Sequence, residues 1–157
     1  MRRLLSSGLV LFAGVVSPVA ITPHQSQKPT SPDYRKDPRF HALRRFFEVW
    51  NCPAKEYSHA FLEAADIYKL DWRLLPSISF VESTGGKVAH NNNIFGWDSG
   101  RARFTSPAAG IHTVGYHLSH ASQYKRKNLD QLLATYNPAS DYAQRVKSVM
   151  RQIAPTR

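Results

Sequence analysis

Apolar residues recur at intervals of three or four from Phe40 to the carboxyl end, and this spacing is the strongest constraint on the fold. Leu43, Phe46 and Trp50 form the first such stripe, which stops near Pro53. Intervals of three and four place side chains on one face of an α-helix, whereas a half-buried strand would alternate apolar and polar residues. The sequence contains no convincing alternating segment. We therefore predict an all-α domain.

Five further helices are expected after this stripe, and caps or helix breakers mark several of their ends. Asp71 is expected to cap a helix that runs to Glu82, with Pro76 in its first turns. Ser106 and Pro107 form a cap followed by a first-turn proline. The expected spans are 57–68, 72–82, 107–118, 129–136 and 141–153.

Residues 1–20 have the features of a secretory signal peptide. Arg2 and Arg3 precede an apolar run over residues 4–16, and the small residues Ser17 and Ala20 follow. The run is short for a membrane span, and the order basic, apolar, small is typical of a cleaved signal. An uncleaved anchor is the alternative. We expect the mature protein to be secreted or periplasmic, without stable insertion in the membrane.

Residues 21–39 are expected to form a linker, because they carry four prolines among polar residues. The folded domain is then expected over residues 40–157. The chain has 21 Lys and Arg against 11 Asp and Glu, a formal charge of +10, which favours an anionic partner or environment. A single cysteine, Cys52, excludes a disulfide scaffold or a cysteine-rich zinc module. No nucleic-acid-binding signature accompanies the dispersed basic residues, so we expect no nucleic acid partner.

Glu82 is the acid whose position best suits catalysis. It lies seven residues after Leu75 and four after Ile78, so it continues an apolar stripe toward the end of its helix. A carboxyl group on an apolar face is desolvated, and desolvation favours the protonated form. A protonated carboxyl at the rim of a cleft can act as a general acid on a leaving oxygen. The alternative is a structural carboxylate paired with Lys or Arg.

The expected loop over residues 84–100 carries groups suited to a sugar. Asn91, Asn92 and Asn93 offer amide donors and acceptors, and Phe95 and Trp97 offer flat apolar faces. Sugars present hydroxyls at their edges and C–H groups on their faces, so amides and aromatic rings together can bind them. We expect one of the two rings to lie in the core and the other to be partly exposed.

Three strings point to a known family: residues 82–86 (ESTGG), 92–97 (NNIFGW) and 136–138 (YNP), followed by Tyr142-Ala143. In this order they resemble the bacterial cell-wall glucosaminidases (mannosyl-glycoprotein endo-beta-N-acetylglucosaminidase-like domains) of the lysozyme-like superfamily. The resemblance extends over about residues 61–153. It implies a lysozyme-like helical domain with a glycan-binding cleft and cleavage of β-1,4 bonds in peptidoglycan.

The resemblance also implies a site. Glu82 would be the general acid. Tyr136, the second candidate catalytic residue, would lie close to its carboxyl group and to the scissile sugar and would steady the developing charge. The candidate substrate-binding residues are Ser83, Asn92, Asn93, Phe95, Trp97, Asp98, Asn137 and Tyr142.

A second carboxylate is not evident after Glu82. Asp130 and Asp141 lie at expected helix starts, where a carboxylate stabilises the helix, and Asp98 is either a second catalytic acid or part of a turn. If Glu82 acts alone, the substrate's N-acetyl oxygen can attack the anomeric carbon, or the muramyl 6-hydroxyl can attack, as in a lytic transglycosylase. The Asn-Asn-Ile-Phe-Gly string favours a glucosaminidase, and both routes stay open.

No metal or cofactor is expected. His117 and His120 are three residues apart on one expected helix, a spacing that can bind metal, but no third ligand accompanies them. A noncatalytic peptidoglycan-binding or assembly protein is the alternative function, and an acid on an apolar stripe argues against it. We expect peptidoglycan glycan strands as the partner and a monomeric chain.

Overall fold

A computed structural model describes residues 32–155 of the chain. The expected signal peptide over residues 1–20 and the expected linker up to residue 31 lie outside this part. Within it the fold is all-α, as predicted, with six α-helices and no strand. The helices are α1 Pro38–Val49, α2 Ser58–Tyr68, α3 Leu74–Ser83, α4 Pro107–His120, α5 Leu129–Tyr136 and α6 Tyr142–Ile153, with 3-10 turns η1 Tyr34–Lys36 and η2 Pro53–Tyr57.

The folded domain starts earlier than position 40, the start expected from the sequence. Tyr34 is 5% exposed, and its hydroxyl donates a hydrogen bond of 2.8 Å to Asp66 of α2. Pro38 occupies the first turn of α1, where a missing backbone N–H breaks no helical hydrogen bond, and the Asp37 side chain caps that turn. A proline at this position therefore starts the helix instead of extending a linker, and residues 32–39 belong to the domain.

The helix that carries Glu82 also starts differently from the prediction. Its N-cap is Arg73, and Asp71 lies outside the helix. The Asp71 carboxylate accepts from the Arg73 backbone N–H at 2.9 Å, and the Asp71 carbonyl accepts from that of Leu74. Asp71 thus closes a turn just before α3. The predicted cap at Ser106 is confirmed, because its hydroxyl accepts from the backbone N–H of Ala109.

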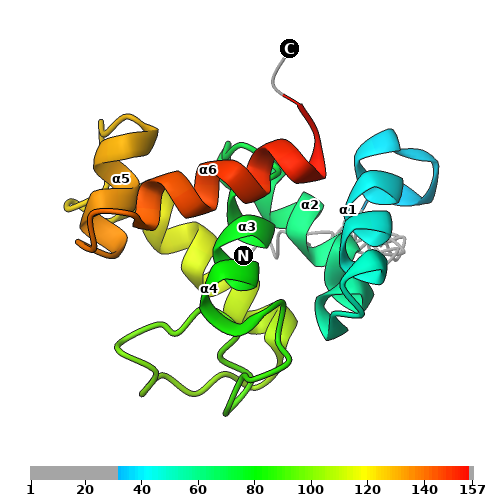
Figure 1. Cartoon of the computed structure of the whole chain (residues 1–157), viewed down its shortest axis with the longest axis horizontal. Coiled ribbons are helices and arrows are strands. Elements are labelled where there is room, and N and C mark those ends of the chain that lie inside the picture. Colours follow the sequence, from blue (N-terminus) through cyan, green and yellow to red (C-terminus); the bar gives the residue numbers. More distant parts are fainter. Residues whose placement is uncertain (1–31, 156–157) are drawn as a thin grey trace, which may run out of the picture. The chain divides into compact units, whose positions relative to one another are not determined.

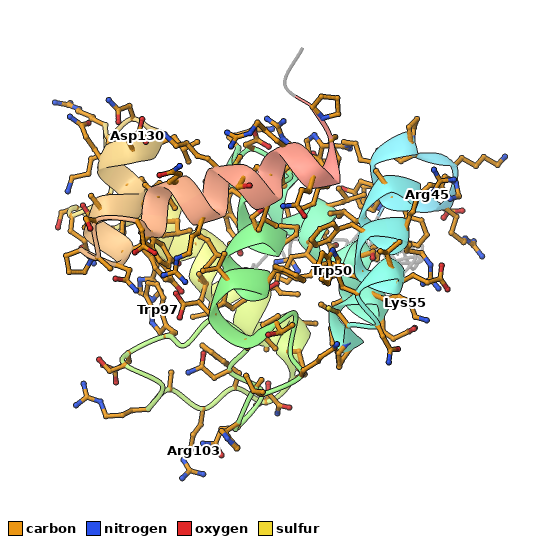
Figure 2. All side chains as sticks on the ribbon, viewed as in Figure 1. Arg45, Trp50, Lys55, Trp97, Arg103 and Asp130 are labelled. Carbon is orange, nitrogen blue, oxygen red and sulfur yellow. The ribbon has the colours of Figure 1, made fainter. Side chains whose placement is uncertain are left out.

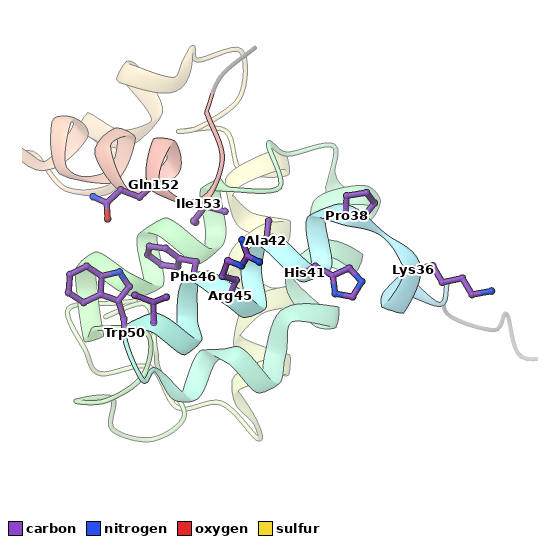
Figure 3. A pocket seen from close by; sticks show the side chains of 10 residues that line it. Lys36, Pro38, His41, Ala42, Arg45, Phe46, Trp50, Gln152 and Ile153 are labelled. Carbon is purple, nitrogen blue, oxygen red and sulfur yellow. The ribbon is translucent and has the colours of Figure 1, made fainter.

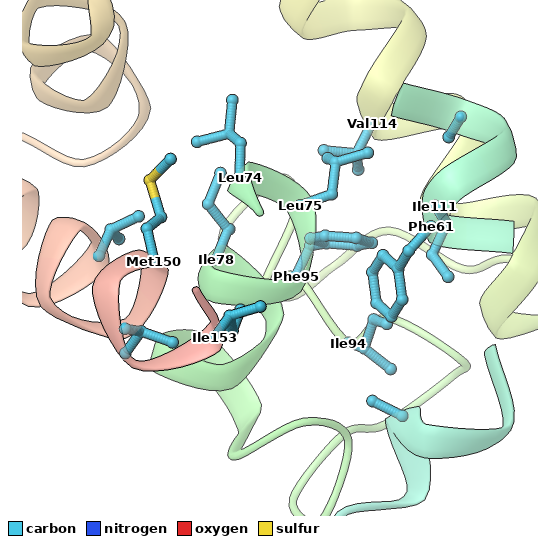
Figure 4. Close-up of a cluster of buried hydrophobic side chains, with 14 of the residues drawn as sticks. Phe61, Leu74, Leu75, Ile78, Ile94, Phe95, Ile111, Val114, Met150 and Ile153 are labelled. Carbon is cyan, nitrogen blue, oxygen red and sulfur yellow. The ribbon is translucent and has the colours of Figure 1, made fainter. Parts of the chain in front are cut away.

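Helix α3 lies at the centre of the packed helices (Figure 1) and contacts α6, while α2 contacts α4. Leu75 and Ile78 of α3 belong to one buried cluster with Phe61 of α2, Val114 of α4 and Met150 of α6 (Figure 4). Seven of the ten residues of α3 are buried. The last turn of this helix therefore carries Glu82 outward from the core on a rigid support.

Cys52 and the residues around it close the core beneath the loop that follows α3. Its thiol is buried, and burial raises the pKa of that thiol. Gly85 lies against it, because a Cβ at Gly85 would come within 2.8 Å of the Cys52 Cβ. Only glycine fits here, since the backbone also has a positive φ of 60°.

The longest helix in the described part, α4, has 14 residues, whereas a membrane-spanning helix needs about 20. None of the helices described is long and apolar enough to cross a membrane.

Candidate functional site

Glu82 lies in the last turn of α3, half-buried, directly before the turn that ends the helix. Thr84 follows in the left-handed conformation, and its backbone N–H bonds back to the carbonyls of Phe80 and Ser79. Ser83 was expected to contact substrate, but it is only 3% exposed. Its hydroxyl donates to the Ile94 carbonyl at 2.7 Å and accepts from a backbone N–H of the loop. Ser83 therefore fastens the loop to α3 and has no free face for a ligand.

Gly96 brings the loop into direct contact with the Glu82 carboxyl group. A Cβ built on Gly96 would lie 2.8 Å from Glu82 Oε2, and the backbone there has a positive φ of 59°. Both facts require glycine, because a methyl group would displace the carboxylate and side chains rarely adopt this conformation. The loop thus covers one side of the acid with a bare backbone.

Asn93 holds the Gly96 turn in place. Its Nδ2 donates to the Trp97 carbonyl at 3.0 Å, and its Oδ1 accepts from the Trp97 backbone N–H at 2.9 Å. The side chain is 4% exposed. The amide expected to bind a sugar is instead used entirely within the protein, and its role is to position Gly96 and Trp97.

The two aromatic residues of the loop divide as predicted. The Phe95 ring is fully buried, at 0% exposure, whereas Trp97 is partly exposed. The Phe95 ring cannot meet a sugar, so its expected place in the cleft is wrong for the side chain. Its backbone still matters, because the Phe95 carbonyl accepts from the Tyr136 hydroxyl at 2.6 Å.

Two stacked tyrosines lie near Glu82. The rings of Tyr136 and Tyr142 are nearly parallel, 5.9 Å apart. Burial and then the charge of Glu82 raise the pKa of Tyr136 well above its ordinary value. Burial, Tyr136 and Glu82, in that order, raise the pKa of Tyr142. Both phenols therefore stay protonated close to the carboxylate.

The Tyr142 hydroxyl is a buried polar group close to the Glu82 carboxyl group. The residue is 1% exposed, and within residues 32–155 its hydroxyl forms no hydrogen bond of ordinary length and angle. Glu82 is nevertheless near enough to influence its titration. Tyr142 was expected to bind substrate, but its burial leaves it a supporting position behind Glu82.

A cavity of about 370 Å³ opens beside this cluster, lined by Gly96, Trp97, Asp98, Ser99, Tyr124 and Tyr136. Trp97 stacks on His117 at 5.5 Å and lies 5.7 Å from the Tyr136 ring, so its orientation is set by packing. Figure 2 shows Trp97 on the α5 side of α3. The lining of the cavity combines a flat aromatic face with polar groups. One lining residue, Gly96, also contacts Glu82.

Tyr124 and Ser99 line this cavity and were missed in the sequence. Tyr124 lies in a turn after α4 among basic residues, without a motif or helical stripe to mark it. Its ring is 8% exposed. The sequence signal for Gly96 is its place between two aromatic residues, where a glycine lets the backbone approach another group.

Asp98 lines the cavity, but its carboxylate forms an ion pair with a neighbouring arginine. Its Oδ1 accepts from Arg101 at 2.7 Å in an exposed ion pair, and that hydrogen bond lowers the pKa of Asp98. Asp130 pairs with Lys147 at 2.5 Å and Asp141 with Arg145 at 3.0 Å. These contacts account for all three carboxylates after Glu82 as partners of basic side chains.

Among the expected residues, Trp97, Asp98 and Tyr136 line the cavity, and Asn92 and Asn137 are two of those that do not. Asn92 donates to the Phe104 carbonyl at 2.9 Å from an exposed position. The Asn137 side chain accepts from the backbone N–H of Ala139 at 3.0 Å and closes a turn after α5. The structure thus places Trp97, Asp98 and Tyr136 on the cavity. Glu82 contacts the lining residue Gly96, and Tyr142 stacks on the lining residue Tyr136. The remaining expected residues build the loops: Ser83, Asn92, Asn93, Phe95 and Asn137.

The two histidines weighed as metal ligands each stack on an aromatic ring. His117 stacks on Trp97, and His120 stacks on Tyr116 at 4.5 Å. Over residues 32–155, no group of three or more His, Cys, Asp or Glu residues is arranged to hold a metal ion.

The chain matches no protein-family model and none of the curated proteins with which it was compared. The geometry around Glu82 and the sequence strings that surround it are therefore the basis for assigning a function.

Proposed function

We propose that this chain is an exported peptidoglycan hydrolase, an endo-β-N-acetylglucosaminidase of the lysozyme-like class with Glu82 as its general acid and base. The observation that carries the proposal is the contact between Gly96 and the Glu82 carboxyl group at the edge of the aromatic cavity. Because Gly96 has no side chain, the loop that lines the cavity can come close to the carboxyl group. The signal-like residues 1–20 and the charge of +10 suit an enzyme of the anionic cell envelope.

The surroundings of Glu82 favour a mechanism with one protein carboxylate. Asp98 is exposed and paired with Arg101, so it is a weak nucleophile and a poor base. In the substrate-assisted route, the N-acetyl oxygen forms a bond to the anomeric carbon while the glycosidic bond breaks. Glu82 gives its proton to the leaving oxygen. It then takes a proton from the water that opens the cyclic intermediate, which restores the acid and leaves a reducing-end sugar.

The aromatic groups have separate roles in this proposal. Trp97 offers the partly exposed face for the sugar ring. Tyr136 acts as a positioning residue, because its hydroxyl proton is engaged by the Phe95 carbonyl. This hydrogen bond holds in place the loop segment that includes Gly96. The buried Tyr142 hydroxyl can donate a hydrogen bond to the carboxylate form of Glu82 after proton transfer.

A lytic transglycosylase is the second candidate. It also needs one protein carboxylate, and Asp98, the acid that lines the cavity, is paired with Arg101. In that reaction the muramyl 6-hydroxyl replaces water as the attacking group, and Glu82 acts first as acid and then as base. A noncatalytic glycan-binding protein remains the third candidate and would need only the aromatic cavity.

Mass spectrometry of purified peptidoglycan after incubation with the mature domain tests the proposal. We expect wild-type protein to release fragments with reducing-end N-acetylglucosamine, and Glu82→Gln to release none, because an amide cannot supply an acidic proton. Glu56→Gln is the matched control, since Glu56 is an exposed acid in η2. Anhydro-muramyl ends would assign the transglycosylase reaction instead. Turnover retained in Glu82→Gln, or intact glycan that binds both proteins, would overturn the enzyme assignment.

A further inference from the structure

A second hollow of the domain lies along α1 and the end of α6, away from the cavity beside Glu82. This α1 groove has a volume of about 780 Å³ (Figure 3), and none of the residues that line it also lines that cavity. In Figure 2 the groove residue Trp50 lies on the α1 side of α3, whereas Trp97 lies on the α5 side. The proposed hydrolase activity does not use this surface.

The floor of the α1 groove is apolar and held rigidly. Phe46 lies 5.0 Å from Phe80 of α3, and Trp50 lies 5.5 Å from the same ring, each edge to face. Trp50 is nevertheless 47% exposed, and Val49 beside it is 76% exposed. Rigid, partly exposed aromatic residues in a hollow are the usual anchors of protein–protein recognition, because little conformational entropy is lost when a partner covers them.

The groove is also lined by unpaired cations. Lys36 and Arg45 line it, and neither is among the ion pairs or hydrogen bonds of the described residues. Basic residues nearby differ, because Arg35 pairs with Asp33, Arg39 with Asp37 and Asp66, and Lys55 with Glu48.

No Asp or Glu lines the groove. Its side chains along α1 extend over a helix of 12 residues, about 18 Å long at the usual rise. An extended segment of about six residues would cover that length. The groove thus offers an apolar floor and positive charges that nothing in the described domain neutralises.

We propose that the α1 groove binds an acidic polypeptide segment of a partner protein, with apolar side chains inserted against Trp50 and Phe46 and carboxylates facing Lys36 and Arg45. Charge complementarity carries this choice of occupant. A second copy of this chain is disfavoured, since the formal charge of +10 makes two copies repel. A lipid surface fits less well, because the apolar side chains lie in a hollow between two helices, where a flat bilayer makes little contact.

Fluorescence anisotropy with a labelled octapeptide tests this proposal. The probe is fluorescein-Asp-Phe-Glu-Glu-Leu-Phe-Asp-Asp, and the same peptide with Lys in place of each acid is the peptide control. We expect saturable binding of the acidic probe, weakened at least about tenfold by Arg45→Glu and by Trp50→Ala. Lys125→Glu is the matched control, because it makes the same charge change at an exposed position outside the groove.

Arg45→Glu keeps the test decisive if Trp50→Ala unfolds, since Arg45 is exposed and outside the core. Three results would overturn the proposal. One is equal loss of binding in Arg45→Glu and Lys125→Glu, which would mean a diffuse charge effect. Another is binding of phosphatidylglycerol vesicles, but not of the peptide, that depends on Trp50. The third is displacement of the peptide by a disaccharide-tetrapeptide from peptidoglycan, which would make the groove part of the substrate site. Loss of hydrolysis in Glu82→Gln would leave all three readouts unchanged.

Discussion

Replacing Gly96 with alanine should separate the position of the Glu82 carboxyl group from the stability of its loop. The added Cβ would lie 2.8 Å from Glu82 Oε2, closer than side-chain atoms normally approach. The carboxyl group would therefore have to move by several tenths of an ångström or change rotamer. An alanine held at the observed φ of 59° also costs about 1 to 2 kcal/mol of backbone strain.

Gly100→Ala is the matched control for this substitution. Gly100 lies in the same loop with a positive φ of 79°, and a Cβ there would meet nothing within 4 Å. Both variants should lose free energy of unfolding through backbone strain, and Gly96→Ala should lose more because of its contact with Glu82. The melting temperature should fall by about 4 °C for each kcal/mol. Only Gly96→Ala should also displace the acid.

The assay is release of dye from labelled peptidoglycan, run beside thermal melting followed by circular dichroism. We expect Gly100→Ala to keep nearly the full rate at a temperature where it is folded. Gly96→Ala should lose about 10- to 100-fold, because small displacements of a catalytic group have effects of that size. Equal rates in the two folded variants would refute the reasoning, since the contact with Gly96 would then not set the working position of Glu82.

Two further predictions concern groups that hold the site and the domain edge. Tyr136→Phe removes the hydrogen bond to the loop carbonyl, so we expect the free energy of unfolding, measured with urea, to fall by about 1 kcal/mol. The rate should fall less than for Glu82→Gln and its pH profile should not change; a change in the alkaline limb of that profile, where a phenol of raised pKa titrates, would instead give Tyr136 a direct part in proton transfer. Arg39 lowers the pKa of Asp66 and of Asp37 through hydrogen bonds. These ion pairs therefore stabilise the fold above about pH 4, and their stabilisation is lost as the pH falls through the lowered pKa values. Arg39→Gln should therefore cost about 1 kcal/mol at pH 7 and little at pH 2; a cost independent of pH, measured by thermal melting at both values, would show that the arginine acts by packing alone.

The helices were predictable because their signals are local. The cap at Ser106 and the spacing of apolar residues in 129–136 act within a few positions of the chain, and the structure contains both features where the sequence indicated them. The same local logic failed at Asp71 and at Pro38. Each of these residues can serve either a helix start or the turn beside it, and packing of distant segments decided between the two.

In the candidate site, too, the sequence indicated some features and not others. Glu82 was a candidate acid because it continues an apolar stripe, and its catalytic role stays a prediction. One buried and one partly exposed ring were expected for Phe95 and Trp97, and the structure has both. The sequence did not reveal that the Asn93 amide is consumed by the backbone around Trp97. An amide in a loop can bind a ligand or its own chain, and the choice depends on the path of that loop.

Only the tertiary structure placed Gly96 against Glu82 and joined the Tyr136 hydroxyl to the Phe95 carbonyl, 41 residues away in the chain. It also brought Tyr124 to the same cavity from a turn with no motif. Helix formation depends on neighbours three and four positions apart, so sequence spacing determines it. The approach of a loop to a carboxyl group depends on how buried surfaces of separate helices pack, and no spacing within one segment contains that information.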